Sequence, residues 1–99
     1  MELIGKTVVV TGGARGLGRA YCESLAEQGA NVVAGDIRDT GDTIESVKSA
    51  GGHAIGVHLD VTDASSCNDM ATAAIEAYGR IDSLVNLSLI HISEPTRPY

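Results

Sequence analysis

The sequence predicts an α/β fold in which helices cover a parallel sheet. Short apolar runs alternate with segments of helical spacing, which indicates about four strands and three helices. The first apolar run, residues 7–11, is β-branched throughout, as is typical of a strand buried on both faces. Four glycines follow between Thr11 and Gly18, where this strand would turn into a helix. Because strand–helix–strand units are wound by right-handed crossovers, the strands should run parallel in one sheet.

The first strand and helix are predicted to lie at the centre of the fold. The strand covers residues 7–11, and the helix covers residues 17–28. Leu17, Tyr21 and Leu25 recur every four residues in this helix, and a glycine follows its end. We expect this apolar face to pack on the sheet.

A second strand and helix follow the same pattern. The strand over residues 31–35 ends at Asp36, and the helix covers residues 40–50. Thr40 stands where an N-cap is expected. Two glycines after the helix act as its terminator.

A third unit and a fourth strand complete the pattern. A strand over residues 53–59 leads to a helix over residues 64–78, which Thr62 or Asp63 can cap. The fourth strand lies within residues 81–86. The third helix is apolar at the helical period, at Cys67, Met70 or Ala71, Ala74, Ile75 and Tyr78.

Length and composition limit what this fold can belong to. The chain has 99 residues, fewer than a doubly wound dinucleotide-binding fold normally needs, so we expect a partial domain. The net charge of −6 and the lack of a Lys/Arg cluster disfavour nucleic-acid and anionic-membrane surfaces, so small molecules are the expected partners. Cys22 and Cys67 have no partner spacing and are expected to be reduced, buried thiols. With no signal peptide and no long apolar run, the protein is expected to be cytoplasmic.

The glycine-rich turn is predicted to bind phosphate. Glycine there permits positive φ, and the free N–H groups at the start of the following helix attract an anion. Gly13 and Gly18 have the spacing of a nucleoside-triphosphate loop, but Arg19 and Ala20 stand where that motif needs Lys and Ser or Thr. The nucleoside-triphosphatase interpretation is therefore disfavoured.

A dinucleotide is the ligand that the next strand favours. Asp36 lies at the end of the second strand, where an acidic residue accepts hydrogen bonds from the adenosine ribose. A carboxylate repels a 2′-phosphate, so we predict NAD rather than NADP. Arg15 and Arg38 argue against this preference for NAD, because either could reach toward a 2′-phosphate.

Four motifs follow one another within residues 6–86: Thr11-Gly12-Gly13-Ala14-Arg15-Gly16-Leu17-Gly18, Asp36, Asp60-Val61-Thr62-Asp63 and Leu84-Val85-Asn86. In this order they resemble the N-terminal part of a short-chain dehydrogenase/reductase. The resemblance implies a Rossmann-type doubly wound parallel sheet, here incomplete, with residues 1–86 as a partial NAD(P)-binding domain. It also implies hydride transfer between a nicotinamide cofactor and an alcohol or carbonyl substrate.

The resemblance implies a set of cofactor-binding residues. These are Gly12, Arg15, Gly16, Leu17 and Gly18 for the pyrophosphate and nicotinamide side, Asp36 and Ile37 for the adenosine ribose, Asp60 and Val61 for the adenine, and Asn86 beside the cofactor riboses. The family's catalytic serine, tyrosine and lysine would lie beyond residue 86, so we assign no catalytic residue and no metal ligand here. We expect no turnover from this chain and doubtful stability, whereas a longer parent enzyme would be a homo-oligomer, commonly a tetramer. A dinucleotide-binding module without catalysis, used for redox sensing or interaction, is the alternative.

Residues 87–99 depart from the family pattern. After Leu-Val-Asn the family continues with a second Asn and then Ala-Gly, whereas this chain continues with Leu-Ser-Leu-Ile-His-Ile-Ser-Glu-Pro-Thr-Arg. That run matches the translation of a transposon-end sequencing adapter residue for residue. We therefore predict that residues 87–99 are a non-native tail.

Overall fold

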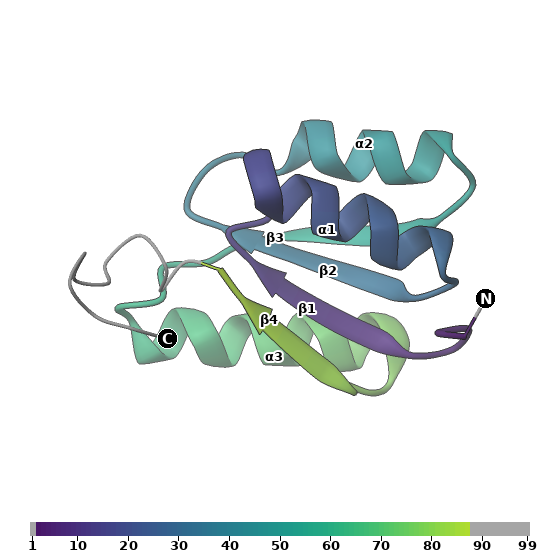
Figure 1. Cartoon of the computed structure of the whole chain (residues 1–99). Helices are drawn as coiled ribbons and strands as arrows, with labels where there is room; N and C mark the ends of the chain where they lie inside the picture. Colours follow the sequence, from purple (N-terminus) through teal and green to yellow (C-terminus); the bar gives the residue numbers. More distant parts are fainter. Residues whose placement is uncertain (1, 88–99) are drawn as a thin grey trace, which may run out of the picture.

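The computed structural model describes residues 2–87, which form one parallel sheet flanked by helices (Figure 1). The elements alternate along the chain as β1 (Thr7–Thr11), α1 (Gly16–Glu27), β2 (Asn31–Asp36), α2 (Gly41–Ser49), β3 (His53–His58), α3 (Ala64–Tyr78) and β4 (Ser83–Asn86). The α/β class predicted from the sequence is confirmed, with four strands and three helices. The element bounds agree with the sequence pattern to within two residues.

The strands lie in the order β3-β2-β1-β4 and all pair in parallel. The chain builds outward from β1 through β2 to β3, and then returns to place β4 on the other side of β1. Parallel strands bring their carboxyl ends to one edge, and a change in the direction of winding opens a crevice between the loops at that edge. This order therefore creates a crevice next to the end of β1.

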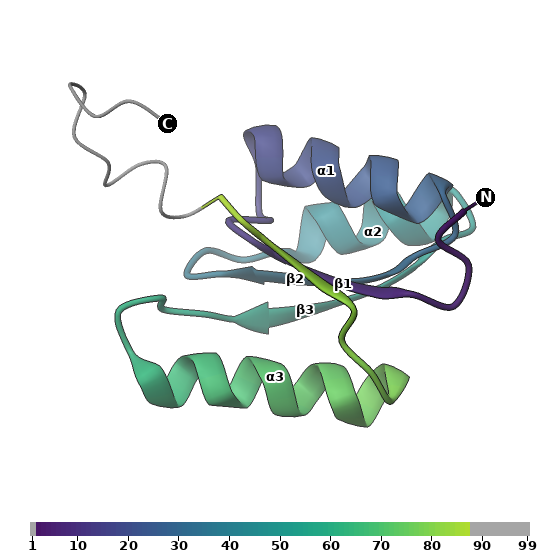
Figure 2. The ribbon, with the colours of Figure 1, turned by 60° about the horizontal axis from the view of Figure 1, so that its bottom comes forward.

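Two helices cover one face of the sheet and one covers the other (Figures 1 and 2). Helices α1 and α2 lie side by side above the sheet, and α3 lies below it. In β1, Val8 and Val10 join the core under α1 and α2, whereas Val9 joins the core on α3. Every residue of β1 is buried, because alternate side chains point into two different cores.

The predicted contact face of α1 is wrong for two of its three large residues, since only Leu25 packs against the core. The side chains of Leu17 and Tyr21 are 61% and 41% exposed, and the residues that the helix buries are Gly18 and Cys22. Small side chains bring the helix axis close to the sheet, and this close approach turns the two large side chains outward. Hydrophobicity at helical spacing indicated the helix but not its orientation.

The other helices follow the sequence more closely. Asp63 caps α3 by accepting a hydrogen bond from the Ser65 backbone N–H at 2.9 Å. Met70 and Ala74 are buried in α3, whereas Ile75 is exposed, contrary to prediction. Thr40 precedes α2 as predicted, but within residues 2–87 its side chain makes no capping hydrogen bond.

The cysteines are both free, as predicted. Cys22 is fully buried on the face of α1 toward the sheet, and burial, assisted by the charge of Glu23, raises the pKa of its thiol to about 12. Cys67 is only half-buried. At neutral pH the Cys22 thiol therefore stays protonated and unreactive.

Asp82 fastens the amino ends of β1 and β4 together. Its carboxylate accepts hydrogen bonds from the Thr7 backbone N–H at 2.8 Å and from the Arg80 guanidinium at 2.6 and 2.8 Å. The Arg80 hydrogen bonds, followed by that from Thr7, hold the pKa of Asp82 below its ordinary value. A carboxylate with a lowered folded pKa stabilises the fold above its unfolded pKa and loses this contribution as the pH falls through the lower value.

We predict that Asp82→Asn lowers the free energy of unfolding at pH 7, and that the difference from the unaltered chain narrows as the pH falls below about 4. Urea denaturation followed by circular dichroism at a series of pH values measures this difference. The same change at Asp69, an exposed carboxylate in α3, is the control and should cost under about 0.5 kcal/mol. A deficit for Asp82→Asn that is independent of pH would contradict the assignment.

Candidate functional site

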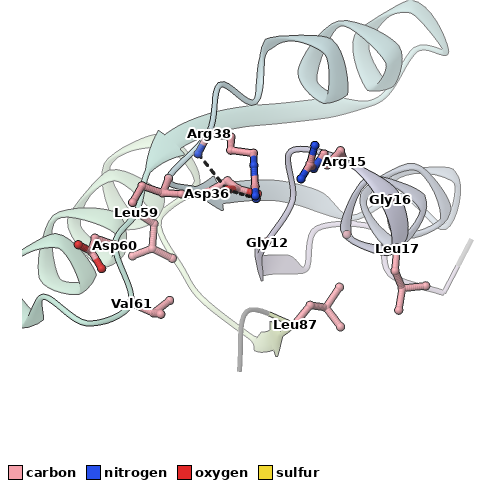
Figure 3. A pocket seen from close by; sticks show the side chains of 12 residues that line it. Gly12, Arg15, Gly16, Leu17, Asp36, Arg38, Leu59, Asp60, Val61 and Leu87 are labelled. Carbon is pink, nitrogen blue, oxygen red and sulfur yellow. Dashed lines mark hydrogen bonds and ion pairs between the residues drawn. The ribbon is translucent and has the colours of Figure 1, made fainter. Parts of the chain in front are cut away.

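A pocket of about 550 Å³ lies at the carboxyl edge of the sheet, in the crevice that the strand order creates (Figure 3). Its wall is built from the segments that follow each strand and from the start of α1. The lining residues are Gly12, Arg15, Gly16, Leu17, Gly18, Asp36, Ile37, Arg38, Leu59, Asp60, Val61 and Leu87. Loops from all four strands therefore converge on one cavity.

The glycines of the loop after β1 are required by geometry. Gly12 and Gly16 have φ values of 77° and 59°, in the region that disfavours other residues. A Cβ on Gly18 would overlap the carbonyl oxygen of Gly12 and come within 3.0 Å of the Gly13 Cα. Gly18 thus lets the first turn of α1 lie directly against the loop.

The start of α1 faces the pocket with free backbone donors. The first N–H groups of a helix have no partner within it, and within residues 2–87 no side chain caps α1 at Arg15. Gly16, Leu17 and Gly18 of this first turn all line the pocket. Free N–H groups and the positive end of the helix dipole make this wall suited to an anion such as a phosphate.

Asp36 ends β2 and lines the same pocket, next to the glycine loop. The residue is only 6% exposed, and both carboxylate oxygens accept backbone hydrogen bonds: Oδ2 from Ala14 at 3.0 Å and Oδ1 from Arg38 at 2.9 Å. An ionised carboxylate offers about four acceptor positions, so capacity remains for hydroxyl groups in the pocket. Asp36 is therefore both a candidate ligand contact and a support for the glycine loop.

Two arginines lie at the same end of the pocket as Asp36 (Figure 3). Arg38 Nη1 is 3.9 Å from Asp36 Oδ1, and the Arg38 side chain is more than half exposed. Arg15 is exposed at the start of α1. The carboxylate is therefore not the only charge that a ligand would meet there.

The segment after β3 forms a third wall, part apolar and part charged. Leu59 is buried in the core on α3, and Val61 packs against the same core. Asp60 Oδ1 accepts from the Thr62 hydroxyl at 2.6 Å and from the Thr62 backbone at 2.9 Å. These bonds hold the pKa of Asp60 below its usual value, so the carboxylate is ionised at neutral pH.

Asn86 ends β4 beside the pocket but is not among its lining residues. Its Oδ1 accepts a hydrogen bond from the Thr11 hydroxyl at 2.7 Å, which ties the ends of β1 and β4 together. The next residue, Leu87, lines the pocket and is buried in the core under α1 and α2. Of the predicted non-native tail, residues 88–99 lie outside the described residues.

The structure brings together all but one of the residues predicted to bind a cofactor. Asn86 is the exception, although it adjoins the cavity through Leu87. Sequence reasoning missed Leu59 in the wall, because an apolar residue at a strand end carries no motif, and Leu87, because it was assigned to the predicted non-native tail. It also missed Thr43 in α2, whose hydroxyl reaches the glycine loop from behind.

Among residues 2–87, no three His, Cys, Asp or Glu side chains come together as a metal site. Nor does this part contain a helix of the length and apolarity needed to cross a membrane.

Comparison with known proteins gives concordant matches. The family model for short chain dehydrogenase matches residues 6–97. The chain is 44% identical over 93 residues to 2,5-dichloro-2,5-cyclohexadiene-1,4-diol dehydrogenase LinX of Sphingobium indicum, with 91% of the chain and 37% of that protein covered. It is 45% identical over 92 residues to L-rhamnose 1-dehydrogenase (NAD(P)(+)) of Azotobacter vinelandii, covering 87% of the chain and 36% of that protein.

Solved structures match equally well. A hydroxysteroid dehydrogenase from Escherichia coli superposes with a TM-score of 0.84 at 31% identity, covering 86% of this chain and 37% of the other. A short-chain dehydrogenase/reductase from Burkholderia xenovorans, described as putative, has a TM-score of 0.81 at 36% identity, covering 87% of this chain and 37% of the other. The chain thus spans little more than a third of the length of these relatives.

We predict that Gly18→Ala lowers the free energy of unfolding by roughly 1–3 kcal/mol, because the added methyl group forces α1 away from the Gly12 carbonyl. Urea denaturation measures the change. Gly41→Ala is the matched control, because there the nearest atom to a new Cβ is the movable Asp39 carboxylate at 3.1 Å. Equal effects at both positions would show that the contact between α1 and the loop is not tight.

Proposed function

The chain belongs to the short-chain dehydrogenase family, and we propose that it forms the cofactor-binding part of an oxidoreductase that uses NAD. The observation that carries the proposal is the pocket itself. A helix start suited to phosphate, at Gly16–Gly18, and a buried carboxylate, Asp36, line one cavity. A dinucleotide needs both, since its pyrophosphate is anionic and its riboses carry hydroxyl donors.

The lining residues fit a dinucleotide in three parts. The backbone N–H groups at the start of α1 would hold the pyrophosphate. Asp36, with Ile37 beside it, would accept hydrogen bonds from the adenosine ribose, and Asp60 and Val61 would line the adenine. Asn86 would lie beside the cofactor riboses. Its hydrogen bond from the Thr11 hydroxyl holds its side chain at the end of β4.

The dinucleotide supplies the hydride chemistry when it is bound, and the residues of this chain bind and orient it. The longer protein would present an alcohol or carbonyl substrate to the nicotinamide, as the names of the matched diol and sugar dehydrogenases suggest. The serine and the Tyr-x-x-x-Lys pair expected of the family are not in this sequence, so we infer no turnover from the chain alone. A homo-oligomeric parent enzyme is part of the same proposal.

Charge at the ribose end supports NAD over NADP. A 2′-phosphate would have to lie beside the Asp36 carboxylate, whose ion pair with Arg38 is long, at 3.9 Å, and made by a side chain that is more than half exposed. Two like charges about 4 Å apart repel by roughly 1 kcal/mol even in water, and by more in a partly buried site. Arg15 and Arg38 oppose this repulsion only from exposed positions.

We predict that the unaltered chain binds NADH at least about fivefold more tightly than NADPH, measured by titration of the reduced-nicotinamide fluorescence. Asp36→Asn should reduce this ratio, because it removes the charge that the 2′-phosphate meets. The ratio is the informative quantity, since both ligands share the pyrophosphate contacts. Asp42→Asn, which removes an exposed charge in the first turn of α2, is the matched control and should leave the ratio unchanged.

Tighter binding of NADPH to the unaltered chain would overturn the NAD assignment. Absence of saturable binding of either cofactor would overturn the proposed function itself.

A further inference from the structure

One peptide group in the glycine loop is held from both sides by buried side chains. The carbonyl oxygen of Gly13 and the N–H of Ala14 belong to the same peptide bond. Thr43 Oγ1 lies 2.8 Å from that oxygen, and Asp36 Oδ2 accepts from that N–H at 3.0 Å. Because the C=O and N–H of a trans peptide point in opposite directions, the two side chains grip it from opposite sides.

Thr43 reaches the loop from the first turn of α2, 30 residues further along the chain. The residue is fully buried, and its hydroxyl also lies 3.1 Å from the carbonyl oxygen of Ala14. With one proton, the hydroxyl donates to the nearer Gly13 oxygen or shares its proton between the two. Among residues 2–87, the hydroxyl therefore makes hydrogen bonds only to the loop.

Packing requires a glycine at position 13, and glycine would let the Gly13–Ala14 peptide rotate. The loop therefore needs hydrogen bonds that hold this peptide in one orientation. A Cβ on Gly13 would lie 3.0 Å from the Ala34 Cβ, so the position admits little more than glycine. Glycine leaves the backbone on the amino side of this peptide unusually free to rotate. A flipped peptide would aim the Gly13 carbonyl at the Asp36 carboxylate and take the nearer of the two acceptors away from Thr43, leaving it only the Ala14 oxygen at 3.1 Å.

The orientation of this peptide sets the direction of the chain into α1. Upstream, the N–H groups of Gly12 and Gly13 are fixed by the Gly35 carbonyl at 2.8 and 3.2 Å. Downstream, Arg15 to Gly18 present the N–H groups that face the pocket. The Gly13–Ala14 peptide is the joint between the two segments.

We propose that Thr43 is a positioning residue for the nucleotide pocket: with Asp36 it clamps the Gly13–Ala14 peptide and so aims the N–H groups of the α1 start at the pyrophosphate. This inference rests on the proposed function, because it assumes that a dinucleotide occupies the pocket. The proposal gives Asp36 and Thr43 different roles in the pocket. Asp36 touches the ligand and the loop, whereas Thr43 acts only through the loop.

The test compares Thr43→Val, which keeps the shape and removes the hydroxyl, with Thr43→Ser, which keeps the hydroxyl. Thr7→Val is the matched control, since Thr7 is also fully buried but its hydroxyl has no hydrogen-bond partner within residues 2–87. NADH and adenosine are titrated into each ¹⁵N-labelled full chain and followed by NMR. Adenosine carries no phosphate and reports the ribose and adenine contacts without the α1 start.

Thr43→Val is expected to raise the Kd for NADH about five- to tenfold, the worth of roughly one hydrogen bond. Its Kd for adenosine should stay within about twofold of the unaltered chain. Thr43→Ser and Thr7→Val should bind both ligands as the unaltered chain does. A merely structural role for Thr43 would instead weaken NADH and adenosine in proportion, and this outcome would overturn the proposal.

The outcomes for the two proposals are distinguishable. If the unaltered chain does not bind NADH, the proposed function fails. If it does bind NADH and Thr43→Val binds equally well, the clamp is refuted while the function stands. Should Thr43→Val not fold, amide exchange in the unaltered chain decides: the Ala14 amide must exchange at least about tenfold more slowly than that of Arg15. An unprotected Ala14 amide would overturn the clamp.

Discussion

The contact between Gly18 and the carbonyl of Gly12 is the constraint on which the rest of the site depends. A Cβ atom on Gly18 would overlap the Gly12 carbonyl oxygen, so no larger residue fits there. Because Gly18 has no side chain, α1 begins directly against the loop that follows β1, and the free N–H groups of the helix reach the crevice. The same close approach buries Cys22 on the face of α1 toward the sheet, whereas Leu17 faces outward and lines the pocket.

Asp36 has a structural role that the sequence does not indicate, in addition to the ligand contact that it predicts. Its position at the end of β2 predicted a ribose acceptor. The structure adds that the carboxylate is nearly buried and bonded to the backbone of Ala14, so it also holds the loop. Changing this residue alters the shape of the phosphate wall as well as the charge at the ribose, and affinity measurements on such variants combine both effects.

The fold was largely predictable, because strand and helix periods are local signals and a glycine shortly after each helix marks its end. The buried strand at Val8–Val10 and the cap at Asp63 were readable in this way. The orientation of α1 was not, because apolar spacing favoured Leu17 over smaller neighbours. The role of Thr43 could not be predicted for a different reason. Its hydrogen-bond acceptors lie 29 and 30 residues away in the sequence, and nothing in its local sequence indicates them.

The most direct measurement of the central claim is a map of backbone amide shifts when NADH is titrated into the ¹⁵N-labelled chain. The account predicts that the largest saturable changes fall on residues 12–18, with smaller ones on 36–38 and 60–61, the segments that line the pocket. The groove between α1 and α2, lined by Glu23, Ser46 and Gly52, should change little. Largest changes in that groove, or none that saturate at the glycine loop, would contradict the account.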